Sequence, residues 1–321
     1  MSEKKTILIT RRMPEAVKKK ADLDFNVKYN PSDSLFSKKT LINKSNDVDG
    51  ILICSNDKID KSVINDLPSS VKIISCYTAG YENIDFQYAA KRGITVTNSP
   101  DSVTIPTAEI AMLLILGTAR RAVEADNLIR QNQWSGWHTE FMLGQSLSGK
   151  RLGILGMGRI GRALAERARG FGLEIHYHNR SRLPESLELG ANYHETNESL
   201  LKSSDILSLN CSLTETTRNF LNSDRILMLP KGAIVINTSR GEVIDDEALI
   251  NALETNQIYA AGLDVFCDEP NVEKRYIDLS NTFLLPHIGS ATFEGRNGMG
   301  FQALENLKIF FAGISPPNKV N

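Results

Sequence analysis

Three charged residues in the last third of the chain each follow a short apolar segment that has the pattern of a strand. They are Arg240, Glu269 and His287. A guanidinium, a carboxylate and an imidazole at the carboxyl ends of neighbouring strands can transfer a proton beside an anionic substrate. Alone, each would be an ordinary surface or structural residue, so the prediction depends on their occurring together. The preceding strand candidates are residues 233–237, 262–265 and 282–285.

A glycine-rich segment precedes all three residues. Residues 151–155 have the pattern of a buried strand, glycines follow in G-x-G-x-x-G spacing, and a helical pattern begins directly afterwards. This strand, turn and helix favour a dinucleotide site over a purely structural turn, because glycines let the backbone approach a pyrophosphate at a helix N-terminus. The expected cofactor contacts are Gly156, Met157, Gly158, Arg159, Ile160 and Gly161.

The next expected strand, residues 173–178, ends in a basic turn. An NAD site usually has an acidic residue here to bind the ribose 2′-hydroxyl. This turn has none and instead contains two arginines, which suit a phosphate. The sequence therefore favours NADP (as NADPH) over NAD, which stays possible, and the alternative is a solvated basic turn. The residues concerned are Asn179, Arg180, Ser181 and Arg182.

Composition limits the class of protein. The chain has 321 residues, 41% hydrophobic and 23% charged, which suits a globular protein of two domains. A net charge of −1 and a pI near 6.5 give no electrostatic argument for nucleic acid or an anionic membrane. The first residues lead into a strand without a signal-peptide pattern, and the four cysteines lack Cys-x-x-Cys spacing. We therefore expect a cytoplasmic protein without a metal site.

Strand and helix patterns alternate along the chain, which predicts an α/β fold with parallel sheets covered on both faces. The strand candidates form two groups, so we expect two doubly wound domains. The first group is 6–10, 50–54, 71–76 and 94–97; the second is 151–155, 173–178, 205–209, 233–237, 262–265 and 282–285.

Three further segments have distinct patterns. Residues 107–130 predict one long helix with a broad apolar face, starting near Pro106 and linking the two groups of strands. Residues 131–149, with Trp134 and Trp137, predict an irregular loop or a dimerisation arm, and residues 293–311 predict another helix.

The chain resembles the D-isomer-specific 2-hydroxyacid dehydrogenases from roughly residue 51 to residue 311. The stretches that carry the resemblance are the glycine loop and residues 237–245, 261–270 and 286–292. The basic turn and the tryptophan segment look most like the NADP-dependent glyoxylate/hydroxypyruvate reductase branch. The resemblance implies reduction of a small 2-keto acid to the D-2-hydroxy acid by hydride transfer. It implies His287 as proton donor and acceptor, Glu269 as its partner, and Arg240 as the residue that holds the substrate carboxylate.

Other positions follow from the resemblance alone. Asp264 and Thr107 would lie near the cofactor, and Ala79 and Gly80 would bind the substrate together with Arg240 and His287. The family's His-x-Pro-Leu-Thr loop here has Asn210 and Ser212 in place of His and Pro, so a plain strand-to-helix loop is the alternative there. The remaining implied cofactor contacts are Cys211, Ser212, Thr217, Thr238, Ser239 and Gly289.

The resemblance also implies an architecture. A flavodoxin-like substrate domain, residues 1–100 plus 287–321, would enclose a cleft with a Rossmann cofactor domain, residues 101–286, in a homodimer. One rival is a phosphoglycerate dehydrogenase-like enzyme, and formate dehydrogenase fits less well because that branch has Gln where Glu269 stands. A nucleotide-sensing, corepressor-like binding protein is a rival from another class. Turnover at ordinary enzyme rates would distinguish the dehydrogenase from this sensor.

Overall fold

The computed structural model describes residues 4–321. Residues 1–3, on which part of the expectation about a signal peptide depends, lie outside the described residues. The described chain forms two compact units. One comprises the chain up to Val103 together with Ser290–Asn321, and the other is the continuous segment Thr104–Gly289.

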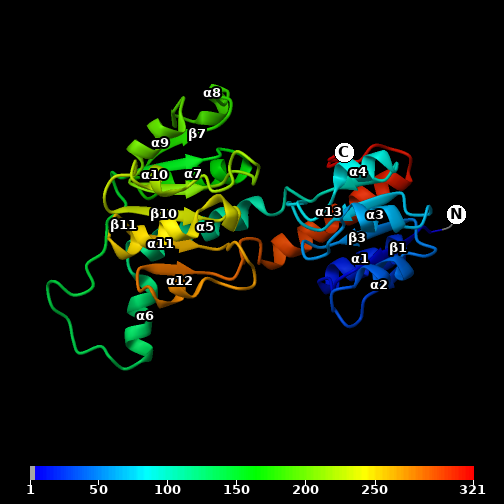
Figure 1. The fold of residues 1–321 in the computed structure, drawn as a ribbon, viewed down its shortest axis with the longest axis horizontal. Coiled ribbons are helices and arrows are strands. Elements are labelled where there is room, and N and C mark those ends of the chain that lie inside the picture. The colour runs from blue at the N-terminus through cyan, green and yellow to red at the C-terminus, as the bar shows by residue number, and fades with distance from the viewer. Residues whose placement is uncertain (1–3) are drawn as a thin grey trace. The chain divides into compact units, whose positions relative to one another are not determined.

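The first unit is a doubly wound sheet. Its strand order is β2-β1-β3-β4-β5 with every pair parallel, which is the flavodoxin-like order. Helices α1 and α13 cover one face and α2, α3 and α4 the other, each over its own apolar core. The elements are β1 Thr6–Ile9, α1 Glu15–Asp24, β2 Asn26–Tyr29, α2 Lys38–Lys44, β3 Gly50–Ile53, α3 Lys61–Asp66, β4 Ile73–Cys76, α4 Phe86–Lys91, β5 Thr95–Thr97 and α13 Phe293–Phe311 (Figure 1).

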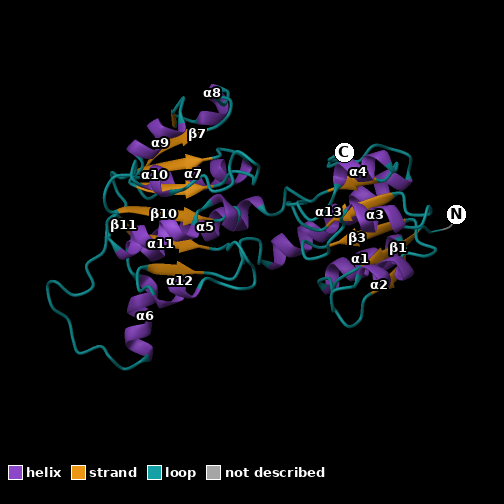
Figure 2. Cartoon of the chain, in the orientation of Figure 1, coloured by secondary structure: helices purple, strands orange, loops and turns teal. Residues whose placement is uncertain are grey.

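The second unit is a seven-stranded parallel sheet in the order β12-β11-β10-β9-β6-β7-β8. This is the Rossmann order with an added edge strand, and the order reverses between β6 and β9. Helices flank the strands of this sheet (Figure 2). The elements are α5 Thr104–Ala119, α6 Ala122–Arg130, β6 Arg151–Leu155, α7 Arg159–Arg169, β7 Glu174–His178, α8 Glu185–Glu188, β8 Asn192–Tyr193, α9 Asn197–Ser203, β9 Ile206–Leu209, α10 Ser223–Ile226, β10 Ala233–Asn237, a 3-10 turn at Gly241–Val243, α11 Asp246–Glu254, β11 Ile258–Leu263, α12 Lys274–Asp278 and β12 Thr282–Leu284. The two parallel α/β sheets confirm the predicted fold class.

The single long helix predicted for residues 107–130 is wrong. The chain forms α5 and α6, separated at Arg121, whose φ of 54° is left-handed. The carbonyl of Ala119 accepts a hydrogen bond from Gln145 N at 2.7 Å. Arg121 pairs with Glu124 at 2.6 Å, in the first turn of α6. The returning chain therefore caps α5 where the apolar pattern alone gave no reason for the helix to end.

Two strands were not predicted, and one begins earlier than predicted. β2 and β8 lie at the sheet edges, are short, and contain polar residues without a clear alternation. β11 begins at Ile258, four residues before the predicted start; the missed residues are Ile258 and Tyr259, which favour strands, followed by two alanines, which do not. The predicted helix at residues 293–311 is confirmed as α13.

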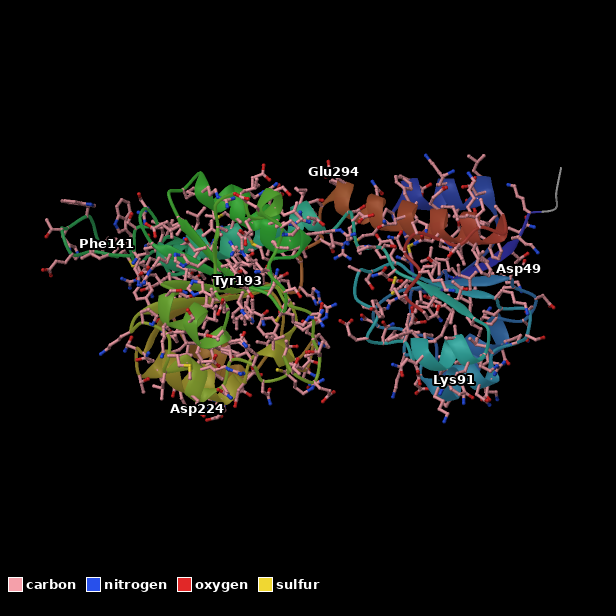
Figure 3. All side chains as sticks on the ribbon, turned by 90° about the horizontal axis from the view of Figure 1, so that it is seen from above. Asp49, Lys91, Phe141, Tyr193, Asp224 and Glu294 are labelled. Atoms are coloured by element: carbon pink, nitrogen blue, oxygen red, sulfur yellow. The ribbon has the colours of Figure 1, made fainter. Side chains whose placement is uncertain are left out.

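The segment between α6 and β6 is irregular, as predicted. It extends away from the sheet of its unit, with Phe141 near its tip (Figures 1 and 3). Trp134, Trp137 and Leu143 of this segment are exposed, with 80% of the Trp137 surface accessible, whereas Leu147 is buried. Within residues 4–321, no helix is both long and apolar enough to cross a membrane.

Candidate active site

The sheet topology brings the three predicted residues to one edge. β10, β11 and β12 are parallel neighbours, paired in register through Asn237, Leu263 and Leu284 near their carboxyl ends. Arg240, Glu269 and His287 occur in the loops that leave these three strands. Parallel strands end at a common edge, so residues distant in sequence approach one another there.

Glu269 and His287 form a short hydrogen bond, with Oε2 of the carboxylate 2.6 Å from Nδ1 of the imidazole. The other carboxylate oxygen accepts from the backbone N–H of Phe266 at 2.9 Å. Burial raises the pKa of Glu269, but the hydrogen bonds from His287 and Phe266, together with nearby positive charge, bring the pKa below its usual value. Glu269 is therefore an ionised partner that holds the imidazole through Nδ1.

The opposite ring nitrogen of His287, Nε2, makes no hydrogen bond within the described part of the chain. The residue has a φ of 53°, a left-handed conformation that is uncommon for a non-glycine residue. Such strain is found mainly where the surrounding structure over-determines a functional side chain. The geometry leaves Nε2 as the atom that can exchange a proton with a ligand.

Gly241 allows Arg240 to approach this pair. A Cβ at Gly241 would lie only 2.0 Å from the backbone carbonyl carbon of Phe266, so the two loops are in direct contact. The Arg240 loop is also fixed by Asn237, whose amide donates to the Arg240 carbonyl at 2.8 Å. The guanidinium is close enough to Glu269 for its charge to help lower the pKa of that carboxyl. Sequence analysis found Arg240 but not the role of the adjacent glycine.

Asp264 holds the loop of His287 through hydrogen bonds to its backbone. Its carboxylate is 1% exposed and accepts from Ile288 N at 2.8 Å and from Gly289 N at 2.7 Å. Burial raises its pKa, and the two backbone donors oppose that shift only in part. A Cβ at Gly289 would lie 3.3 Å from the Thr107 hydroxyl oxygen, so Thr107 lies beside the same loop. Asp264 therefore joins the end of β11 to the residues that directly follow His287.

The glycine loop has the geometry of a dinucleotide cradle. A Cβ at Gly156 would lie 2.7 Å from Cys211 N, and one at Gly161 would lie 2.5 Å from the Gly156 carbonyl oxygen. At Gly158, by contrast, an added Cβ would meet nothing within 4 Å, so the backbone there borders open space. Gly158 also precedes α7 without a side-chain cap. The open backbone at Gly158 and the uncapped start of α7 thus leave room for a pyrophosphate.

Two buried polar atoms lie at the same edge of the sheet. The Oδ1 atom of Asn210, after β9, and the hydroxyl of Thr238, after β10, have no hydrogen-bond partner among residues 4–321. Buried polar groups are normally satisfied, so these two atoms fit a ligand that carries hydroxyl or amide groups. Together with the open glycine loop, they fit a nicotinamide dinucleotide.

The comparisons with known proteins agree with this geometry. Residues 112–289 match the family model described as D-isomer specific 2-hydroxyacid dehydrogenase, NAD binding domain. A glycerate dehydrogenase of Hyphomicrobium methylovorum is 44% identical over 312 residues, which cover 97% of this chain and 97% of the relative.

The chain belongs to the D-isomer-specific 2-hydroxyacid dehydrogenases. It is therefore an NAD(P)-dependent oxidoreductase. A glyoxylate reductase of Thermococcus litoralis is 44% identical, over 99% of this chain and 97% of that protein. The solved NADPH-dependent glyoxylate/hydroxypyruvate reductase of Sinorhizobium meliloti, in complex with NADP and malonate, matches with a TM-score of 0.89 and 32% identity, covering 99% of this chain and 97% of that one.

The predicted cofactor contacts of this dehydrogenase in the loops after β9 and β10 differ in whether their side chains already have hydrogen-bond partners. Burial raises the pKa of Cys211 to about 11, so its thiol is protonated near neutrality. The Thr217 hydroxyl donates to the Ser212 carbonyl at 2.7 Å and accepts from Thr214 N at 2.7 Å. Ser239 donates its hydroxyl to Asn237 at 2.8 Å. The side chains of Thr217 and Ser239 thus shape their own loops, whereas Thr238 keeps an unused hydroxyl.

Ala79 and Gly80 belong to the first unit. Their carbonyl oxygens are engaged, by the Asn98 amide at 2.7 Å and by the Thr78 hydroxyl at 2.8 Å. Their backbone N–H groups donate to no acceptor within the described residues. A loop with two successive amides that have no acceptor among the described residues has the chemistry of an anion-binding nest.

The two arginines of the basic turn after β7 differ in their contacts. All three of Arg180, Ser181 and Arg182 are exposed, but only Arg182 forms an ion pair among the described residues, with Glu188. The remaining turn residue, Asn179, accepts from Met157 N at 2.7 Å and so connects the turn to the glycine loop. Sequence analysis did not identify Glu188, and no local pattern marks it, since its partners come from tertiary structure.

Proposed function

We propose that this dehydrogenase reduces a small 2-keto acid of the glyoxylate or hydroxypyruvate type to the D-2-hydroxy acid, with NADPH as the reductant. The observation that carries the proposal is the Glu269–His287 hydrogen bond at 2.6 Å, which leaves Nε2 of the imidazole without a partner among residues 4–321. A protein that only senses a nucleotide could carry the same pair, so turnover, and not the Glu269–His287 hydrogen bond, distinguishes the two classes.

The chain's own residues would divide the work as follows. When bound, the reduced nicotinamide supplies a hydride to C2 of the keto acid. The carbonyl π electrons move to the oxygen, and that oxygen takes a proton from Nε2 of His287. Glu269 balances the positive imidazole before the transfer and keeps the ring oriented afterwards, and His287 then regains a proton from water. Arg240 would bind the substrate carboxylate and polarise the carbonyl.

The amides of Ala79 and Gly80 are our proposed donors to the same carboxylate, because each has an unused N–H group. Thr238 and Asn210 would give polar contacts to the dinucleotide, since each has a buried atom without a partner among residues 4–321. Arg180 supports NADPH, because an exposed guanidinium after β7 attracts a phosphate. The NADPH-dependent reductase of Sinorhizobium meliloti supports the same coenzyme, and that protein and the glyoxylate reductase of Thermococcus litoralis support the same substrate class.

The test is a kinetic panel on the purified protein. NADPH and NADH are each combined with glyoxylate, hydroxypyruvate, pyruvate and bulkier 2-keto acids, and loss of the reduced-nicotinamide absorbance is followed. We expect turnover with the smallest keto acids, faster at low coenzyme with NADPH, and D-glycerate as the product from hydroxypyruvate on a chiral column. Absence of turnover with every pair, despite coenzyme binding, would favour the sensor class instead.

We also infer that the chain forms a homodimer through residues 131–149. This segment extends from its unit and leaves Trp134 57% exposed and Trp137 80% exposed, which is costly for a monomer. Light scattering on the eluted protein should give twice the 35.6 kDa chain mass. The variant W134S/W137S should shift that mass toward the monomer, and a wild-type monomer at micromolar concentration would contradict the inference.

A further inference from the structure

The turn that follows β7 is held at both of its ends. At its start, Asn179 Oδ1 accepts from the backbone N–H of Met157 at 2.7 Å, which anchors it to the glycine loop. At its end, the backbone N–H of Leu183 donates to the hydroxyl of Tyr177 at 3.1 Å, and Tyr177 is itself 0% exposed. The turn therefore has little freedom to move relative to the glycine loop.

Glu188 strengthens the second anchor. Its carboxylate accepts two hydrogen bonds from the Arg182 guanidinium, at 2.8 and 3.0 Å, and a third from the Tyr177 hydroxyl. The residue is 5% exposed, so the pair has a buried acidic partner. The guanidinium also lies 5.6 Å from the centroid of the Tyr193 ring. A bidentate pair of this kind is directional, unlike most ion pairs at a protein surface.

Arg180 and Ser181 are different from Arg182. All three side chains are exposed, but Arg180 and Ser181 make no side-chain hydrogen bond or ion pair within the described residues. They lie between Asn179, which is bound to the glycine loop, and Arg182, which is bound to Glu188. One guanidinium and one hydroxyl on a fixed turn match a phosphate monoester, which takes a charged donor and a neutral donor on separate oxygens.

We propose that Glu188 and Arg182 are positioning residues for coenzyme discrimination: their pair holds the turn so that Arg180 and Ser181 meet the 2′-phosphate of NADPH. Arg182 then supports the turn and does not bind the phosphate. This narrows the sequence-based expectation, in which both arginines were candidate cofactor contacts. The inference rests on the proposed function only in taking NADPH as the coenzyme.

The proposal predicts a specific pattern of mutant effects. R180Q removes the cation that binds the phosphate and should weaken binding of the 2′-phosphate roughly ten- to a hundred-fold. R182Q leaves the Glu188 carboxylate buried without its cation, so it should disturb the turn and weaken binding roughly three- to ten-fold. In R182Q/E188Q no charge is buried and two amides can bond to each other. This double variant should return to within roughly three-fold of wild type.

The readout is a direct binding measurement that needs no turnover. Isothermal titration with 2′,5′-ADP reports the 2′-phosphate, and titration with 5′-AMP reports the rest of the adenosine site. R275Q is the matched control, because it breaks an exposed ion pair between Arg275 on α12 and Glu247 on α11. It should leave the affinities for 2′,5′-ADP and 5′-AMP unchanged. R182K retains a cation beside Glu188 but loses the bidentate bond, so its affinity should fall between those of R182Q and wild type. Thermal melting of every variant checks that the unit is folded.

Two results would overturn the inference. If R182Q/E188Q lost 2′,5′-ADP affinity as fully as R180Q, Arg182 would be a phosphate ligand and Glu188 would not act through position. If wild type bound 2′,5′-ADP no more tightly than 5′-AMP, the turn would not read a phosphate at all. In that second case, keto-acid reduction with NADH would still uphold the dehydrogenase reaction, so the two failures can be distinguished.

Discussion

Asp264→Asn tests whether the buried carboxylate positions His287. In the native protein each Asp264 oxygen accepts one backbone N–H, from Ile288 at 2.8 Å and from Gly289 at 2.7 Å. An asparagine keeps one acceptor and turns an NH2 group toward the other N–H. The variant therefore loses one charge-assisted bond and leaves a buried donor facing a donor, at about 1.5–3 and 1–3 kcal/mol respectively.

Part of that cost is offset, because the neutral amide avoids the free-energy cost of burying a charge, the same cost that raises the pKa of Asp264. We expect a net loss of about 2–3 kcal/mol in the free energy of unfolding, measured by urea denaturation. Loosening of the loop after His287 should lower kcat about ten-fold or more, because proton transfer depends on sub-ångström placement.

Asp205→Asn is the matched control. Asp205 accepts three hydrogen bonds from Arg151, at 2.8–3.0 Å, but at the start of β6, away from the carboxyl edge of the sheet. We expect D205N to lose stability while keeping kcat. A D264N protein with native kcat would refute the reasoning, as would a D205N protein with the same loss of kcat as D264N.

Three other variants test the same edge of the sheet. His287→Asn should lower kcat with glyoxylate at least a thousand-fold while leaving coenzyme affinity within about three-fold of wild type; comparable activity would exclude His287 as the proton donor. Gly241→Ala adds a Cβ that would lie 2.0 Å from the Phe266 carbonyl carbon, so the Arg240 loop must move. We expect a higher KM for the keto acid as the main effect, with a lower melting temperature as a secondary one. Glu269→Gln tests pH dependence. The pKa of Glu269 is below its usual 4.5, so the stability it provides is present above that value and disappears as pH falls through the folded pKa. The difference in melting temperature between wild type and E269Q should therefore narrow below pH 4.5, and a constant difference would count against an ionised Glu269.

The parts that sequence could predict are those encoded locally. The glycine spacing after a strand and the alternation of strands and helices are short-range patterns, so the glycine loop, the parallel sheets and α13 followed from them. Arg240, Glu269 and His287 were found because each follows a strand, and parallel topology brings such residues to one edge.

What could not be predicted depends on contacts between distant segments. Nothing near Arg121 in sequence shows that the chain returns to cap α5, so the break before α6 was missed. Glu188 has the local pattern of an ordinary helix residue, and only the folded chain brings Arg182 and Tyr177 onto its carboxylate. Asp264 was found by resemblance, but its two backbone donors come from a loop more than twenty residues away.

The order of the two units along the chain has a consequence for biosynthesis. The continuous segment Thr104–Gly289 interrupts the first unit, in which α13, after the interruption, covers one apolar face of the sheet. Ser75 on β4 donates to the Ala303 carbonyl at 2.9 Å, and Val96 on β5 donates to Asn321 at 2.9 Å. As the polypeptide leaves the ribosome, the coenzyme-binding half has its whole sequence available first. The first unit is synthesised first, but its apolar face stays uncovered until α13 has been made. It is therefore the unit that most needs protection from aggregation during translation.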